Sequence, residues 1–409
     1  MAPPVFILGG HQTDFAVNAA RRGHGLYELM SEAVQGALTD CALDVADIQS
    51  AHVGNFVGEL FGGQGQLGGF LGSMDPGFYG LPASRHEAAC ASGSVAALMA
   101  MAEIEAGRYD CVLVLGVELE RNVPGDQAAA YLGAAAWTGR EFADAKYVWP
   151  QCFSDLGDEY RRRYGLRYEH LGRIAEINTS NAKRNPHAQT RGWNFSRESF
   201  TEDDQANPVI AGMVRRQDCG QVTDGASCVI LASEDFARRY AARHGIALDS
   251  LARLLGWGHR TAPMRLAEKL ALSADQPYVF PHLRGAIQDA FQRSGVKDVL
   301  ELDGIETHDC FTTTEYMAID HFGITPPGES WRAIESGDIE IGGRIPVNPS
   351  GGLIGVGHPV GATGVRMLLD AERQVTGRAG GYQVEGAKRF GTLNVGGSAT
   401  TVISFVVGC

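Results

Sequence analysis

The sequence lacks the cysteine pattern of several protein classes. Its 409 residues include eight cysteines, which are scattered and contain no C-x-x-C pair. Structural zinc sites and disulfide frameworks need cysteines at short, regular spacing, so we expect neither a metal site nor disulfides. Free thiols are typical of a reducing compartment, which predicts a cytoplasmic protein.

Long apolar runs and basic charge are also in short supply. No apolar run approaches the roughly 20 residues of a membrane span. The chain has 35 Lys and Arg against 48 Asp and Glu, for a formal net charge of -13. A nucleic-acid-binding protein usually carries a basic stripe. We therefore expect no nucleic-acid partner and no membrane partner.

Short apolar runs alternate with helical patterns along the chain. This alternation is typical of an α/β protein. The predicted strands span residues 5–8, 111–115, 226–231, 299–307, 392–395 and 401–407. The predicted helices span residues 26–41, 94–106, 160–182, 234–244, 281–294, 313–321 and 364–376.

Two parts of the chain repeat one order of elements. Residues 86–117 run from a turn with Cys90, through an alanine-rich helix, to a strand, and residues 348–396 do the same with His358 in the turn. We expect two similar halves that each give one turn to a shared site. The first half comprises residues 1–118 and 223–247, the second residues 248–409. Residues 119–222 have a different composition, and we expect an inserted lobe that covers a ligand.

Cys90 stands at the start of a predicted helix, in the segment EAACASGS. A thiol there meets free backbone N–H groups and the positive end of the helix dipole, which favour the thiolate. We therefore expect a lowered pKa and a primed nucleophile. A lone cysteine before an apolar helix is more often packed core, so this motif alone leaves both interpretations open.

Two further segments carry side chains suited to acyl chemistry. His358 lies in the glycine-rich loop NPSGGLIGVGHPVGATG, where a neutral imidazole could accept a thiol proton. His308 and Cys310 follow a predicted strand in THDCF, the kind of place where α/β proteins carry their sites. Backbone N–H groups near Gly396 could approach a thioester oxygen. Each feature also has a plain alternative in isolation: a surface histidine, a small buried thiol or a tight turn.

Together the three segments resemble the thiolase superfamily over essentially the whole chain. HDCF, where ordinary thiolases have Asn-Glu-Ala-Phe, resembles the sterol-carrier-protein-type branch. The resemblance implies an α/β fold with two Rossmann-like halves in a five-layered α-β-α-β-α core. It also implies an inserted loop domain that binds coenzyme A, and a homodimer or homotetramer.

The resemblance also implies a role for each site residue. Cys90 would accept the acyl group, and His358 would activate it. His308 would join His358 in an oxyanion site, and the N–H groups of Cys90 and Gly396 would form a second one. Ordinary thiolases carry their acid/base cysteine in a Cys-x-Gly near the C-terminus, where this chain has NVG. Cys310 would therefore take over that role.

The implied activity is that of an acyltransferase of lipid metabolism, such as fatty acid β-oxidation. It would cleave 3-ketoacyl-CoA with coenzyme A, or run the reverse Claisen condensation. Coenzyme A would be a co-substrate, with no permanently bound cofactor. Phe311, Arg215 and Arg216 are the candidates for contacts with it, although exposed surface charge is the simpler interpretation of both arginines.

Three alternatives stay open at this point. A thiolase-like aldolase would act on a CoA-linked side chain with a small partner protein. A ketosynthase-type condensing enzyme would use one cysteine and two histidines. A non-catalytic acyl-CoA-binding protein would keep the scaffold without the reaction.

Overall fold

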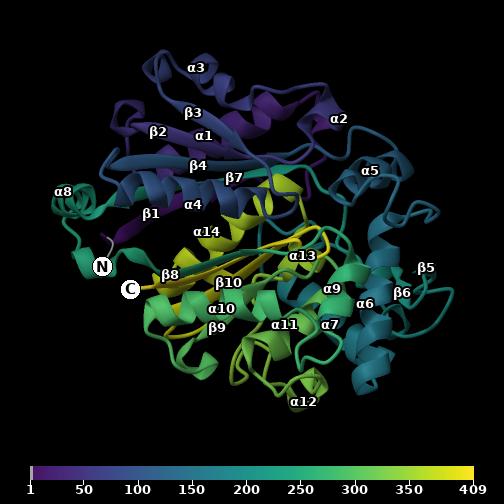
Figure 1. Ribbon diagram of the computed structural model, residues 1–409. Coiled ribbons are helices and arrows are strands. Elements are labelled where there is room, and N and C mark those ends of the chain that lie inside the picture. The colour runs from purple at the N-terminus through teal and green to yellow at the C-terminus, as the bar shows by residue number, and fades with distance from the viewer. Residues whose placement is uncertain (1–2) are drawn as a thin grey trace.

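The computed structural model describes residues 3–409 and contains one large mixed sheet (Figure 1). Its strand order is β3-β2-β4-β7-β1-β8-β11-β10-β9. The strands are β1 (Val5–Gln12), β2 (Ser50–Gly54), β3 (Ala83–His86), β4 (Cys111–Glu118), β7 (Gly225–Ser233), β8 (Ala252–Thr261), β9 (Gly304–Thr307), β10 (Arg389–Gly396) and β11 (Thr401–Gly408). The first five strands in this order all lie before residue 234, and the last four all lie after residue 251.

A short junction connects the two halves of the sheet. β1 pairs with β8 in antiparallel fashion through residues 5–7 and 252–254 alone. Because only this short stretch is shared, the half-sheets fold over a common layer of helices, as Figure 1 shows. The prediction of two α/β halves is confirmed, and the hydrogen-bonded junction between them is an addition to it.

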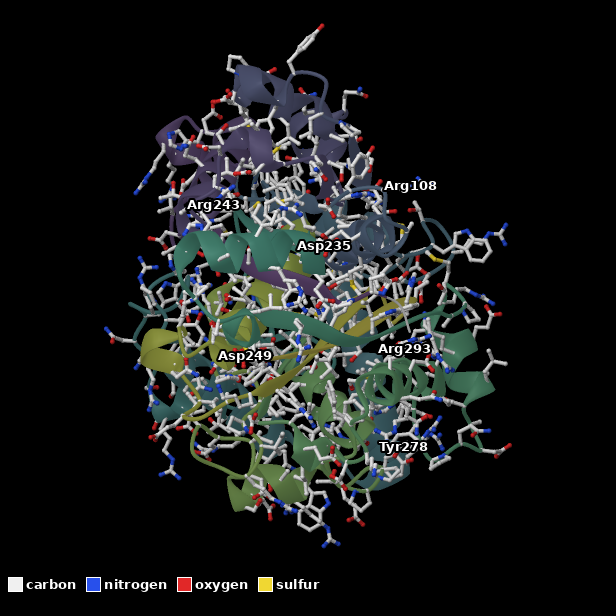
Figure 2. All side chains as sticks on the ribbon, turned by 90° about the vertical axis from the view of Figure 1, so that its left-hand side faces the viewer. Arg108, Asp235, Arg243, Asp249, Tyr278 and Arg293 are labelled. Carbon is white, nitrogen blue, oxygen red and sulfur yellow. The ribbon has the colours of Figure 1, made fainter. Side chains whose placement is uncertain are left out.

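Helices form three layers around the two half-sheets. The central layer holds α4 (Ser92–Glu105) and α14 (Thr363–Val375), and the outer layers hold α1 (Leu26–Asp40) and α8 (Glu234–His244) on one half, and α10 (Pro281–Ser294) and α11 (Thr312–Phe322) on the other. Figure 2 looks onto α8, with Asp235 and Arg243 at its surface and Arg293 of α10 on the opposite half. The layers follow the expected α-β-α-β-α order.

The side chains of β4 explain why both faces of the sheet are covered. Val112 and Val114 pack into the core with α4 and α14, whereas Leu113 and Leu115 pack into the core with α1. Successive side chains of a strand point to opposite faces, so an unbroken apolar run gives a strand that is buried on both sides.

Two glycines let the central helices meet at their first turns. A Cβ atom on Gly93 would lie 2.7 Å from the Gly361 carbonyl oxygen, and one on Gly364 would lie 2.3 Å from the Ser94 hydroxyl. Any side chain there would push the helices apart. The turn before α4 and the loop before α14 therefore lie side by side, although they come from different halves of the chain.

The segment between β4 and β7 is mostly helical. It contains α5 (Gly125–Leu132), α6 (Val148–Tyr164), α7 (Tyr168–Ala182), β5 (Val209–Ala211) and β6 (Val214–Arg215). The predicted single helix over residues 160–182 is wrong, because Gly165 adopts a left-handed φ of 71° and ends α6. Phe153 of α6 and Leu171 of α7 share a core with Tyr316 of α11. This segment thus packs onto the C-terminal half.

Five short helices complete the fold. They are α2 (Gly58–Gly62), α3 (Leu71–Met74), α9 (Leu266–Leu272), α12 (Ser330–Ser336) and α13 (Gly352–Val356). In the described part of the chain, no helix combines the length and the apolar character needed to cross a membrane.

Candidate active site

Cys90 lies in a strained turn between β3 and α4, two residues before the first helical residue. Ala89 has a φ of 51°, a left-handed conformation that is costly for a residue with a side chain. The Ser92 hydroxyl donates to the Ala89 carbonyl oxygen at 2.6 Å and accepts from the Ala88 N–H at 2.9 Å. These bonds hold the turn in the shape that presents the thiol.

The thiol of Cys90 does not have the lowered pKa predicted from its place before a helix. Desolvation raises its pKa to about 12, and the carboxyls of Glu120 and Glu118 act in the same direction. The N–H groups of Gly397 and of Cys90 itself lower the pKa, but burial outweighs them. That prediction is wrong, and Cys90 needs a base to become a nucleophile.

His358 is held as a neutral base in the loop between α13 and α14. Its Nδ1 lies 2.7 Å from Thr363 Oγ1. The Thr363 hydroxyl donates its single proton to the Pro359 carbonyl oxygen at 3.1 Å, so it accepts from Nδ1–H. Nε2 therefore carries a free lone pair. Burial, followed by the charge of Arg366, lowers the pKa of His358 to about 3.

His308, just after β9, has the opposite tautomer. The Asn394 amide Nδ2 donates to His308 Nδ1 at 3.2 Å and to the Cys90 carbonyl oxygen at 3.0 Å, while Asn394 Oδ1 accepts from the Ser94 hydroxyl at 2.8 Å. These partners fix the orientation of the amide. His308 therefore carries its proton on Nε2 and donates from it, and burial holds its pKa well below the usual value.

Cys90, His308 and His358 meet at one point. The Cys90 sulfur and one ring nitrogen of each histidine all lie within 4.8 Å of one another, and the two rings are 5.2 Å apart at 84°. Cysteine and histidine are both residue types that bind zinc. As an acid/base arrangement, these side chains place one proton acceptor and one proton donor beside a thiol.

Cys310 lies between β9 and α11, with Phe311 as the next residue. Its carbonyl oxygen accepts the Gly220 N–H at 2.8 Å, which ties it to the segment before β7. Burial, followed by the nearby Cys90, raises the pKa of the Cys310 thiol well above its usual value. Phe311 stacks on Phe153 with the ring centres 4.7 Å apart.

A cavity of about 160 Å³ connects these groups. Its wall includes Cys90, Cys310, Phe311 and His358. The apolar part of the wall comes largely from the segment between β4 and β7, with Ala129, Leu132, Val148, Trp149 and Phe153. A cavity with apolar walls and few polar groups is typical of a small-molecule site.

Of two adjacent glycines at the end of β10, Gly397 lines the cavity and the predicted Gly396 does not. Gly396 packs against the turn of Cys90 instead, where a Cβ atom would lie 2.3 Å from the Ala88 carbonyl oxygen. Gly396 is thus needed for close approach, and Gly397 brings an N–H group to the Cys90 sulfur.

The two predicted arginines do not line this cavity. The Arg215 guanidinium is 2.8 Å from Asp204 Oδ1, 2.8 Å from the Asn207 carbonyl oxygen and 5.5 Å from the centre of the Tyr168 ring. Arg216 is exposed. The structure thus brings together Cys90, His308, Cys310, Phe311 and His358, but neither arginine.

Sequence reasoning missed the residues that orient the histidines. Thr363 fixes His358, and Asn394 fixes His308. The sequence marks Asn394 only as the place where a cysteine is missing, and nothing in it singles out Thr363. Glu120, a buried acid in the cavity wall, was also missed.

Comparison with known families agrees with this geometry. The thiolase N-terminal domain family matches residues 5–192, and the thiolase C-terminal domain-like family matches residues 266–408. The chain belongs to the thiolase family. It is 31% identical to an acetyl-CoA acetyltransferase of Methanothermobacter thermautotrophicus over 374 residues, which cover 91% of this chain and 92% of that protein.

Sterol carrier protein 2 of Homo sapiens is a further relative. It is 30% identical over 416 residues, which cover 99% of this chain and 72% of that protein. Among solved structures, an Ltp2-ChsH2(DUF35) aldolase has a TM-score of 0.80 at 21% identity, over 100% of this chain and 99% of that one. A human mitochondrial 3-ketoacyl-CoA thiolase in complex with CoA has a TM-score of 0.68 at 17% identity, over 100% and 98%. The predicted thiolase fold is confirmed.

Proposed function

We propose that this member of the thiolase family cleaves 3-ketoacyl-CoA with coenzyme A, or runs the reverse condensation, through an acyl group on Cys90. The observation that carries the proposal is the meeting of two neutral imidazoles of opposite tautomer with two protonated thiols. The relationship to acetyl-CoA acetyltransferases supports an acyltransferase.

In the first half-reaction, His358 Nε2 takes the Cys90 proton as the sulfur attacks carbon 3 of the substrate. This base is required because the resting thiol is protonated. The bond between carbons 2 and 3 breaks, and its electron pair forms the enolate of acetyl-CoA. The Cys310 thiol then protonates carbon 2, and acetyl-CoA leaves.

In the second half-reaction, the thiol of coenzyme A gives its proton to the Cys310 thiolate and attacks the acyl group on Cys90. Cys90 leaves as a thiolate and recovers its proton from the His358 imidazolium. The sum is ketoacyl-CoA plus coenzyme A going to two acyl-CoA molecules. Both thiols and both imidazoles return to their starting protonation states.

Two sets of donors can stabilise the negative oxygens of this sequence. His308 Nε2–H is suited to the enolate oxygen, and the N–H groups of Gly397 and Cys90 are suited to the oxyanion that forms when the sulfur attacks. A preorganised donor of this kind contributes about 3 kcal/mol to transition-state stabilisation.

We assign the pantetheine arm of coenzyme A to the side of the cavity built by the segment between β4 and β7. The apolar wall of Leu132, Val148 and Trp149 supports this assignment, as does Phe311 beside it. The proposal includes a cytoplasmic homodimer or homotetramer.

A second candidate is a thiolase-like aldolase that works with a partner protein. The likeness to the Ltp2-ChsH2(DUF35) aldolase favours it. Against it, both thiols and His358 line one cavity, and a ring nitrogen of His308 lies within 4.8 Å of the Cys90 sulfur. An aldolase reaction gives Cys90 no acyl group to carry.

Acyl transfer to Cys90 separates the two candidates. The protein is mixed with acetoacetyl-CoA without coenzyme A, quenched in acid, and its peptides are mapped by mass spectrometry. We expect an acetyl group on the Cys90 peptide in the wild type and in Cys409→Ser, and none in Cys90→Ser. An unmodified Cys90 in protein that binds the ligand, also with longer ketoacyl chains, would favour the aldolase.

A further inference from the structure

The proposed mechanism gives no role to the buried carboxyl of Glu120, which lies near Cys90. Glu120 lies two residues beyond the end of β4 and is 1% exposed. Its side chain forms part of the cavity wall, together with Cys90 and His358. A carboxyl is costly to bury, so its retention there needs a specific set of partners.

The partners of Glu120 surround His358. One carboxyl oxygen accepts the Val360 N–H at 2.9 Å, and the other accepts the Thr223 N–H at 3.2 Å. Thr223 Oγ1 in turn accepts the N–H of His358 itself at 2.9 Å. The backbone on both sides of His358 is thereby tied to one side chain, directly at Val360 and through Thr223 at His358.

We propose that Glu120 is a positioning residue that holds the His358 loop by these bonds and so aims the imidazole at the Cys90 sulfur. The inference rests on the role of His358 in the proposed function. The carboxyl accepts from two backbone N–H groups at once and bridges two loops that are far apart in the chain. Glu118 accepts the N–H of the next residue, Gly361, at 3.1 Å, whereas Glu120 holds the loop at Val360 and, through Thr223, at His358 itself.

A carboxyl suits this task better than its close isosteres. An amide offers one acceptor oxygen, so Glu120→Gln would direct an NH₂ group at one of the two backbone donors. A buried donor without a partner costs about 1–3 kcal/mol. The loop would relieve this cost by moving, and His358 Nε2 would move with it.

The acidic residues around Glu120 predict a second measurable effect of its loss. Glu118 on β4 and Asp224 before β7 face it, and both act with burial to raise the pKa of Glu120. Glu120 also raises the pKa of Cys90, which is faced by Glu118, Cys310 and the two imidazoles as well. Loss of the carboxyl therefore changes the geometry of the base and the charge near the thiol.

The first test compares Glu120→Gln with the wild type in steady-state cleavage of acetoacetyl-CoA. We expect kcat to fall about 10- to 100-fold, as for a displaced catalytic group, with KM changed less than about threefold. The matched control is Glu141→Gln, another buried glutamate whose partner is the Leu266 N–H and not the His358 loop. It is expected to keep the wild-type kcat.

The second test follows alkylation of Cys90 by iodoacetamide from pH 6 to 11, with the modified peptide measured by mass spectrometry. In Glu120→Gln we expect slower alkylation at pH 7, because the base is misaligned, and a rate that starts to rise at lower pH, because a group that raises the pKa of Cys90 is gone. This readout needs no ketoacyl-CoA, so it tests Glu120 even if no acyl group reaches Cys90 and the proposed function fails.

Wild-type kcat and a wild-type alkylation profile in Glu120→Gln would overturn the inference. So would an equal loss of kcat in Glu141→Gln, which would point to general loosening of the fold. If circular dichroism finds Glu120→Gln unfolded, Thr223→Val decides, because it removes the acceptor of the His358 N–H and leaves Glu120 in place; it also removes the bonds of the Thr223 hydroxyl to Gln189 Oε1 and the Gln221 carbonyl. We expect a 3- to 10-fold loss of kcat in that variant, and an unchanged kcat would overturn the inference.

Discussion

The turns before α4 and α14 occupy equivalent places in the two halves, yet they are held in different ways. The turn of Cys90 depends largely on local backbone geometry and on the Ser92 hydroxyl, and α4 behind it buries only small or apolar residues and no charged side chain. Behind the loop of His358, α14 buries Arg366, which is 2.6 Å from Asp370 and 3.3 Å from Glu306.

The ionic cluster of α14 links the elements that carry the two histidines. Glu306 belongs to β9, which leads to His308, and α14 follows His358. All three charged groups are fully buried. The turn of the proposed nucleophile is therefore shaped largely by local bonds, with Asn394 as a distant partner, whereas the elements that carry the two histidines are joined by a buried ion pair. Two halves with the same order of elements can thus hold their site residues in place by different interactions.

The largest expected effect is the loss of the group that the turn before α4 presents. Cys90→Ala removes the proposed nucleophile, so kcat for cleavage of acetoacetyl-CoA should fall by at least about 10⁴-fold, the scale seen when a covalent nucleophile is deleted. Cys409→Ser, at the far end of β11, serves as the control and should keep full activity. A residual rate within tenfold of the wild type would contradict the role of Cys90.

The next effect tests the ionic support of α14. Arg366→Met leaves Glu306 and Asp370 buried without their partner, which should lower the free energy of unfolding by about 3–5 kcal/mol. Urea unfolding measures it. Met101→Leu in α4 replaces a buried apolar side chain by one of similar volume and should cost less than about 1.5 kcal/mol. Equal losses of unfolding free energy in the two variants would contradict the claim that α14 depends on buried ion pairs in a way that α4 does not.

A pH dependence is expected from the carboxyl of Glu118, which lies at the end of β4. Burial raises its pKa from 4.5 to about 7, so the folded protein binds this proton more tightly than the unfolded chain. Its contribution to stability is full below pH 4.5 and is lost as the pH rises through 7. The loss is roughly 3 kcal/mol for a shift of this size.

Glu118→Gln removes this titration and isolates its contribution. The difference in unfolding free energy between wild type and variant should fall steadily from pH 4.5 to pH 8. A difference that stays constant over this range would show that the Glu118 carboxyl is already ionised in the folded protein at low pH.

The close contact between the two helix starts gives a smaller effect. In Gly93→Ala, the new methyl group meets the Gly361 carbonyl oxygen, which should cost about 1–3 kcal/mol in stability. Because the contact also sets the distance between the two turns, kcat should fall more than thermal stability alone explains. Gly107→Ala, where a Cβ atom meets nothing within 4 Å, provides a comparison that has backbone strain but no clash.

The smallest expected effect concerns the hydroxyl that orients Asn394. Ser94→Ala removes one hydrogen bond to Asn394 Oδ1, worth about 1 kcal/mol. Free rotation of the amide should loosen His308 and lower kcat a few-fold, while Ser94→Thr keeps the hydroxyl and should retain more activity. Equal kcat values in the two variants would show that the hydrogen bond to Asn394 does not affect the position of His308.

The sequence predicts helices well where the chain marks their ends. The bounds of α8 and α10 agree with prediction, because Ser233 caps one through the Phe236 N–H and Pro281 begins the other. β8 is not predicted, since only every second side chain of its first part is fully buried and glycines interrupt its apolar residues. A search for unbroken apolar runs does not detect such a strand.

The proposed reacting groups can be predicted from the sequence, whereas the residues that hold them in place cannot. Motifs identify Cys90, His308, Cys310 and His358 because each lies in a short, unusual segment. Asn394 acts on the Cys90 carbonyl from 304 residues away, a pairing that depends on the two half-sheets folding over one helix layer. The predicted pKa of Cys90 is wrong for the same reason. A helix start is a local feature that the sequence shows, whereas desolvation depends on the packing of the whole fold.

The division of labour between the two thiols is tested most directly by hydrogen exchange at carbon 2 of acetyl-CoA in D₂O, followed by NMR. The wild type and Cys219→Ala, which removes a third thiol of the same cavity, should both exchange these protons. Cys310→Ala should exchange them at least about 100-fold more slowly, as expected when the general acid/base is removed. Exchange at the wild-type rate in Cys310→Ala would contradict the account and favour a condensing enzyme that uses one cysteine and two histidines.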